Sequence, residues 1–169
     1  MPIERFILIA ILVLCLASFA YIPRRRVRRA LLAFLAIQAA NWSVPIGLVQ
    51  TGIVAFPVRG FPAATKIAFL PEFVLCPTIF MWYVILHPDR ARFLVKLGHL
   101  AFFVSLIVAF IYFCNIYTDL YESQKASAEG YALLAYAVYI PIFLLCHLYI
   151  SWFFAPGTTS PENNDGTPS

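Results

Sequence analysis

The chain has 169 residues, of which 62% are hydrophobic and only 12% are charged. Soluble domains carry about a quarter charged residues, so this composition excludes an ordinary soluble protein and a soluble catalytic domain. The net charge of +4 does not indicate nucleic-acid binding, because the chain has no room for an exposed basic face that follows phosphates. At roughly 20 apolar residues per membrane crossing, the apolar content suffices for at most five spans.

The apolar runs predict an all-α, polytopic transmembrane helix bundle over residues 1–156. Its five spans are expected at residues 6–22, 30–56, 67–86, 97–117 and 131–154. The remaining residues, 157–169, are rich in Pro, Gly and Asn and have too little apolar surface to order themselves, so a disordered polar tail is predicted. The first run also resembles a cleaved signal peptide, with residues 18–20 (SFA) as the cleavage site.

A cluster of arginines directly after the first run argues against cleavage and sets the predicted topology. If the run were a signal peptide, these arginines would have to be translocated, whereas cytoplasmic loops normally collect Lys and Arg. With the amino terminus outside and the carboxyl terminus inside, the inner loops hold eight cations and the outer segments four. We therefore expect a multi-pass protein of the cytoplasmic membrane, with a topology set by Arg24, Arg25, Arg26, Arg28 and Arg29.

Glu72 is the acidic residue that stands out, because it falls inside the predicted third span. An acid within a span is costly unless it is protonated, paired or solvated, and it seldom faces lipid. One interpretation is an ion or proton site. The other is that the helix starts at Pro71, which leaves Glu72 at a wet end favoured by the helix dipole, where Arg59 or Lys66 can pair with it.

The second span is the most polar and predicts further partners. Gln38, Asn41 and Pro45 follow at intervals of three and four and share one helical face. Pro45 removes the donor for the Asn41 carbonyl, and Pro77 and Pro141 predict kinks in the third and fifth spans. The candidate intramembrane polar site is a column through the bundle, in which Gln50 lies level with Glu72 and Gln38 level with His147. Such a column describes either a permeation path or interhelical hydrogen bonds.

The sequence predicts no catalytic residues, no metal site and no cofactor. His147 adjoins Cys146, but neighbouring helical positions point about 100° apart, and no second ligand follows at helical spacing. The cysteines fall in apolar runs without a CxxC spacing, so buried free thiols are expected. His87 is interpreted as a solvated turn residue and His99 as an interfacial residue. No GxSxG, HExxH or phosphate-binding glycine loop is present.

Three segments resemble the motifs of a family of small uncharacterised bacterial integral membrane proteins, found mainly in low-GC Gram-positive spore formers. They are residues 56–77 (FPVRGFPAATKIAFLPEFVLCP), 117–120 (YTDL) and 152–154 (WFF). The resemblance implies a multi-span protein without an established activity, and this chain lacks the family's second acid in the fourth span and the Trp after the Tyr-Thr segment. The family-like positions are Pro57, Arg59, Glu72, Pro77, Thr118 and Trp152.

The expected function is that of a non-enzymatic scaffold or partner of other membrane components. The expected partners are the lipid bilayer and either another membrane protein or a second copy of the chain, with no nucleic acid. The alternative is a small ion- or proton-coupled permease that uses Glu72 and the polar column.

Overall fold

The computed structural model describes residues 2–55, 71–118, 122–123 and 127–155. The predicted tail over 157–169 and the family-like positions Pro57 and Arg59 lie outside these residues. The described part consists of helices joined by turns, with one pair of two-residue strands, β1 (Val54–Ala55) and β2 (Glu122–Ser123), which run antiparallel. The helices are α1 (Pro2–Ala20), η1 (Arg24–Arg26), α2 (Val27–Asn41), α3 (Ser43–Gln50), η2 (Pro71–Leu75), α4 (Cys76–Ile85), α5 (Phe93–Tyr117) and α6 (Ala128–Phe153).

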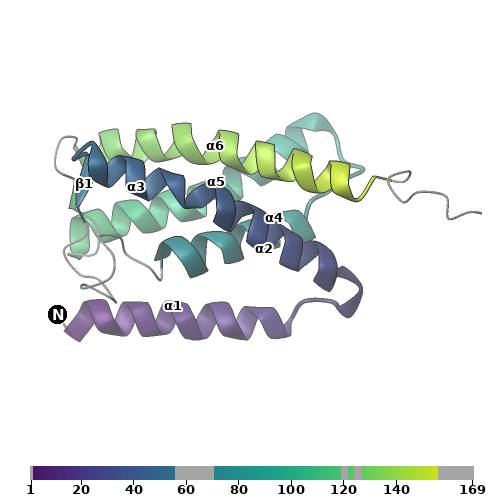
Figure 1. Cartoon of the computed structure of the whole chain (residues 1–169), viewed down its shortest axis with the longest axis horizontal. Helices are drawn as coiled ribbons and strands as arrows, with labels where there is room; N and C mark the ends of the chain where they lie inside the picture. Colours follow the sequence, from purple (N-terminus) through teal and green to yellow (C-terminus); the bar gives the residue numbers. More distant parts are fainter. Residues whose placement is uncertain (1, 56–70, 119–121, 124–126, 156–169) are drawn as a thin grey trace, which may run out of the picture.

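Successive helices run in opposite directions along the long axis (Figure 1), with α2 and α3 forming one pass and η2 and α4 another. The amino terminus, the end of α3 and the start of α6 therefore lie at one end of the bundle. The arginine-rich η1, the segment that joins α4 to α5, and the end of α6 lie at the other. We call this second end the basic end.

Within the described residues, three passes are long and apolar enough to cross a membrane. They are Arg24–Gln50, Phe93–Tyr117 and Ala128–Phe153, with 27, 25 and 26 residues. The other two apolar segments, Phe6–Ala20 and Pro71–Ile85, are shorter, and η2 with α4 reaches only about 22 Å against a hydrocarbon core of about 30 Å. The prediction of five spans is therefore confirmed only in part. Residues 67–70 of the predicted third span lie outside the described residues.

The second pass ends earlier than the predicted span, which extends to residue 56. Gly52 takes a positive φ of 66°, the conformation that glycine adopts without steric cost. The Gly52 amide donates to the Val49 carbonyl and the Ile53 amide to the Leu48 carbonyl. This pattern is a Schellman motif, which satisfies the last carbonyls and terminates α3 at Gln50.

The core lies where α2 packs against α4 and α6, and where α5 packs against α4 and α6. Ala30 and Ala33 of α2 are fully buried, and small residues of this kind allow helices to approach closely in a membrane. Phe80, Val104 and Phe143 fill the space between α4, α5 and α6. The four cysteines are free and buried, as predicted.

The exterior of the helices is apolar. Large hydrophobic side chains are exposed on every long helix, and they include Leu14, Leu35, Phe102, Leu133 and Leu145. Soluble monomers rarely expose apolar surface on this scale, so these side chains fit a hydrocarbon solvent. Among the charged side chains of residues 6–53, 71–118 and 127–155, Glu72 is the one that is buried.

Candidate intramembrane polar site

Glu72 lies in the first turn of η2, where its side chain is only 4% exposed. Pro71 is the first described residue of this pass, so the expected helix start at Pro71 stays a prediction. The Glu72 side chain is buried in the bundle interior. Pro77 follows in the first turn of α4. Because Pro77 cannot donate to the carbonyl of Phe73, the regular α-helical ladder is interrupted here, and residues 71–75 take the wider π form. The π turn orients Glu72 towards α2 and α6.

Hydrogen bonds from two other helices converge on Glu72. The Asn41 side-chain amide donates to the Glu72 backbone carbonyl at 2.9 Å and to Oε2 at 3.1 Å. The Tyr139 hydroxyl donates to the same Oε2 at 3.2 Å, and it lies 3.7 Å from the Cys76 thiol. We call Asn41, Glu72, Cys76 and Tyr139 the Glu72 network. It joins α2, the η2–α4 pass and α6.

Asn41, which reaches Glu72, is the last residue of α2. Pro45 lies four positions further on and supplies no amide proton for the Asn41 carbonyl, and the helix is interrupted at Trp42 before α3 begins. Asn41 is fully buried, and its Oδ1 atom has no hydrogen-bond partner among the described residues. The side chain of Trp42 is 56% exposed, and its ring contacts the ring of Phe73 edge to face.

A cavity of about 20 Å³ adjoins the Glu72 network between α3, α5 and α6. Its wall includes Pro45, Glu72, Ile111, Tyr131 and Tyr139. This volume accommodates about one water molecule, and the carboxylate and hydroxyl groups are suitable partners for it. A substrate larger than water does not fit beside Glu72 in this conformation.

The other predicted site residues do not form one column with Glu72. Gln50 is exposed and Gln38 is half-buried, and the residue that reaches Glu72 is Asn41 instead of Gln50. His147 lies near the opposite end of the bundle, among other histidines. The described contacts therefore group these residues into an interior network around Glu72 and a separate group around His147, and the continuous column between them stays a prediction.

That separate group contains all three histidines of the chain. The ring centroids of His87 and His147 are 4.2 Å apart, and those of His87 and His99 are 5.6 Å apart. The ring of Tyr83 lies between 5.2 and 5.5 Å from each of them. We call His87, His99 and His147 the histidine cluster. Sequence reasoning missed it, because it treated the three residues separately.

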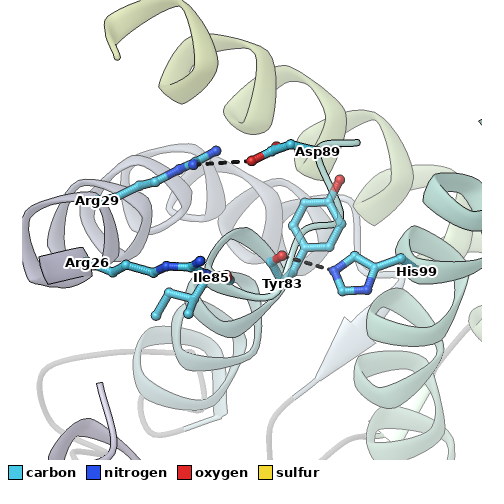
Figure 2. A network of polar contacts seen from close by, with 6 residues as sticks. All are labelled: Arg26, Arg29, Tyr83, Ile85, Asp89 and His99. Atoms are coloured by element: carbon cyan, nitrogen blue, oxygen red, sulfur yellow. Dashed lines mark hydrogen bonds and ion pairs between the residues drawn. The ribbon is translucent and has the colours of Figure 1, made fainter. Parts of the chain in front are cut away.

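Polar contacts position the elements around the histidine cluster (Figure 2). The Arg29 guanidinium lies 3.8 Å from the Asp89 carboxylate, and Arg26 donates to the carbonyl of Ile85. A ring nitrogen of His99 lies 3.0 Å from the carbonyl oxygen of Tyr83. These contacts connect the start of α2 to the end of α4, and the end of α4 to α5.

The environment of His87 lowers its pKa below the ordinary value of 6.5. Burial is the largest cause, because it disfavours the charged ring. Asp89 opposes the shift, while His99, Lys96 and Arg29 add to it. Neutral His87 is therefore favoured at physiological pH.

The described residues contain no group of three His, Cys, Asp or Glu side chains with the geometry to hold a metal ion. Of the family-like positions inside the described residues, Glu72 and Pro77 belong to the η2–α4 pass, whereas Thr118 and Trp152 lie at the ends of α5 and α6. The Thr118 hydroxyl donates to the Cys114 carbonyl at 2.8 Å, and Trp152 is 64% exposed near the end of α6. They do not gather around Glu72.

The chain matches no protein-family model, no curated protein and no solved structure. The resemblance to the bacterial membrane family therefore stays a prediction, and the function is argued from the geometry alone.

Proposed function

We propose that this chain is an integral membrane protein of five spans that serves as a non-enzymatic scaffold for other membrane components. The observation that carries this proposal is the Glu72 network, in which the buried polar groups join helices to one another. Polar residues within spans commonly have this role. The water-sized cavity beside Glu72 supports a bundle that transports no solute larger than water.

The proposed orientation places the basic end in the cytoplasm of a bacterial cell, with the amino terminus outside. It follows from the arginines of η1 and α2 and from Arg90, Arg92 and Lys96, which the alternating helices bring to one end. Labelling of single exposed cysteines tests it. In intact cells, a membrane-impermeant maleimide should label Glu129→Cys at the start of α6 and leave Arg90→Cys unlabelled. The reverse pattern would contradict the orientation.

Purification and reconstitution test the proposed scaffold role. The full chain should co-purify with a membrane protein after mild solubilisation, and proteoliposomes of the pure chain should show no proton or cation flux above empty vesicles. Glu72→Gln keeps an acceptor oxygen for Asn41 and Tyr139, so this variant should retain the partner. Glu129→Gln, which alters an exposed acid, is the matched control.

A proton-coupled permease is the second candidate, and one observation favours it. Glu72 lines a cavity of one-water size beside Tyr131 and Tyr139, an arrangement that suits proton exchange through a bound water. The permease predicts a flux that Glu72→Gln abolishes at unchanged folded yield and that Glu129→Gln leaves intact. Such a result would replace the scaffold proposal.

A further inference from the structure

A second cavity, of about 240 Å³, lies beside the histidine cluster at the basic end. It is more than ten times as large as the cavity at Glu72. Its wall contains both apolar and polar side chains. The apolar ones are Phe93, Leu97, Leu100 and Leu144, and the polar ones are Tyr83, His87, Lys96 and His147. A wall of this kind suits a ligand with a polar head and an apolar chain.

Buried nitrogen atoms at this site have no partner among the described residues. They are Nδ1 of His87, Nδ1 of His147 and Nε of Arg29. A neutral histidine can carry its proton on Nδ1, and the guanidinium Nε always carries one. Buried donors without partners are rare in folded proteins, and each calls for an explanation. Of these three residues, His87 and His147 line the cavity, so a ligand with acceptor oxygens there would satisfy their ring nitrogens.

The charges around the cavity favour an anionic ligand. Lys96 lines the cavity, and Arg29 of α2, which is not part of the wall, adds a positive charge near His87. Asp89 is the acid described at this end, and it lies beside Arg29. The amino terminus of α5 at Phe93 also borders the cavity, and the helix dipole makes such a terminus electropositive. The local field therefore favours a phosphate.

We propose that this cavity binds an anionic phospholipid, whose phosphate is held by Lys96 and the N–H groups of His87 and His147. An acyl chain of the lipid lies against Leu97 and Leu144. Basic pockets between helices on the cytoplasmic side of a membrane bind headgroups by the same chemistry. The apolar residues of the wall favour a lipid over free phosphate, because an acyl chain can pack against them. The inference depends on membrane insertion, but it does not depend on the scaffold role.

Native mass spectrometry of the full chain in detergent tests the proposal. The protein is incubated with equal amounts of phosphatidylglycerol and phosphatidylcholine, and the retained lipids are counted. We expect phosphatidylglycerol to be preferred about fivefold or more, and Lys96→Gln to reduce its retention about fivefold, the usual effect of one basic residue near a headgroup. Arg90→Gln is the matched control, because Arg90 is an exposed cation of the same end that does not line the cavity. It should change retention less than about twofold.

A second variant keeps the proposal testable if Lys96→Gln does not fold. Leu97→Trp should fill the cavity from its exposed apolar side, and should lower phosphatidylglycerol retention while the melting temperature stays the same. Equal retention of the two lipids, or equal losses in Lys96→Gln and Arg90→Gln, would overturn the proposal.

A parallel arm with inorganic phosphate separates the two possible sources of the phosphate group. If inorganic phosphate raises the melting temperature as much as phosphatidylglycerol does, the site binds free phosphate and the lipid assignment is wrong. These outcomes leave the scaffold untouched, because partner retention and flux are measured separately. A chain that stays monodisperse without detergent would instead contradict membrane insertion, and both proposals with it.

Discussion

The Glu72 network and the histidine cluster are two polar groups in one apolar bundle, and they differ in how far their hydrogen bonds are satisfied. The carboxylate of Glu72 accepts hydrogen bonds from α2 and α6 beside a cavity of about 20 Å³. The histidine cluster leaves two ring nitrogens without partners beside a cavity of about 240 Å³. The Glu72 carboxylate is satisfied from within the chain, although Oδ1 of Asn41 in the same network has no partner among the described residues. The unpartnered nitrogens of the histidine cluster differ in that His87 and His147 line an open cavity that can hold a ligand.

The largest expected loss of stability results from breaking the Glu72 network at Asn41. Asn41→Leu removes both hydrogen bonds to Glu72 and leaves a buried carboxyl group with fewer donors, which should cost about 2 kcal/mol. In detergent, the apparent melting temperature should fall by roughly 4–8 °C. Gln38→Leu, one turn earlier on the same helix, is the control and should have a small effect. Equal melting temperatures for both variants would show that the network does not hold the helices together.

A smaller loss is expected when one hydroxyl is removed from the same network. Tyr139→Phe keeps the ring packing but deletes the donor to Oε2 of Glu72, at a cost of about 0.6–1 kcal/mol. The melting temperature should decrease by about 2–4 °C. Tyr149→Phe removes a hydroxyl from an exposed side chain of the same helix and should leave the melting temperature unchanged. A Tyr139→Phe protein as stable as its control would contradict the prediction.

The folding stability contributed by the histidine cluster should depend on pH. Because the pKa of His87 is lower in the folded chain than its ordinary value of 6.5, the unfolded chain binds more protons near that pH. Folding stability contributed by neutral His87 is therefore present above about pH 6.5 and is lost as the pH falls through the folded pKa. The charged and titratable groups that face this ring are Tyr83, Asp89, Lys96, His99, His147 and Arg29.

Melting temperatures of the wild type and of His87→Gln, measured from pH 7.5 to pH 5, test this response. The wild type should lose stability towards pH 5, and His87→Gln should lose less, because the substituted side chain does not titrate. Identical profiles would show that His87 is not responsible.

The smallest effect on stability is expected where a nitrogen has no partner. His147→Phe keeps an aromatic ring against Tyr83 and His87 and removes a polar atom that makes no hydrogen bond within the described structure. Its melting temperature should change by less than about 2 °C, since no bond is lost. The same variant should lower phosphatidylglycerol retention. A large loss of stability would indicate that the histidine cluster is structural, like the Glu72 network.

Much of the helix pattern could be read from local sequence. The apolar runs predicted the five helical passes, and Pro45 and Pro77 lie at the two interruptions, at Trp42 and at the π turn. Pro141, for which a kink was also predicted, lies inside α6, which is one continuous helix from Ala128 to Phe153. The early end of α3 was missed, because the glycine at position 52 was not recognised as the end of a Schellman motif. Glu72 and Asn41 were identified as candidate site residues because a polar side chain within a span is energetically costly. The hydrogen bonds between them were not predicted.

The histidine cluster was not predicted from the sequence. A clue was present, since alternating passes bring the end of the third pass, the start of the fourth and the end of the fifth to the same side. His87, His99 and His147 occupy these three places. The position of a residue along the bundle axis, however, does not determine which faces of neighbouring helices contact one another.

The composition by itself determined that most of this chain is suited to hydrocarbon, because apolar runs of membrane length and charges between the runs are properties of the linear sequence. Only the tertiary structure decided that Asn41 meets Glu72 and that three histidines enclose Tyr83. Hydrogen bonds and ring contacts form over a few ångströms, and the rotation and offset of neighbouring helices set those distances. These quantities depend on how all the passes pack together, and no single segment encodes them.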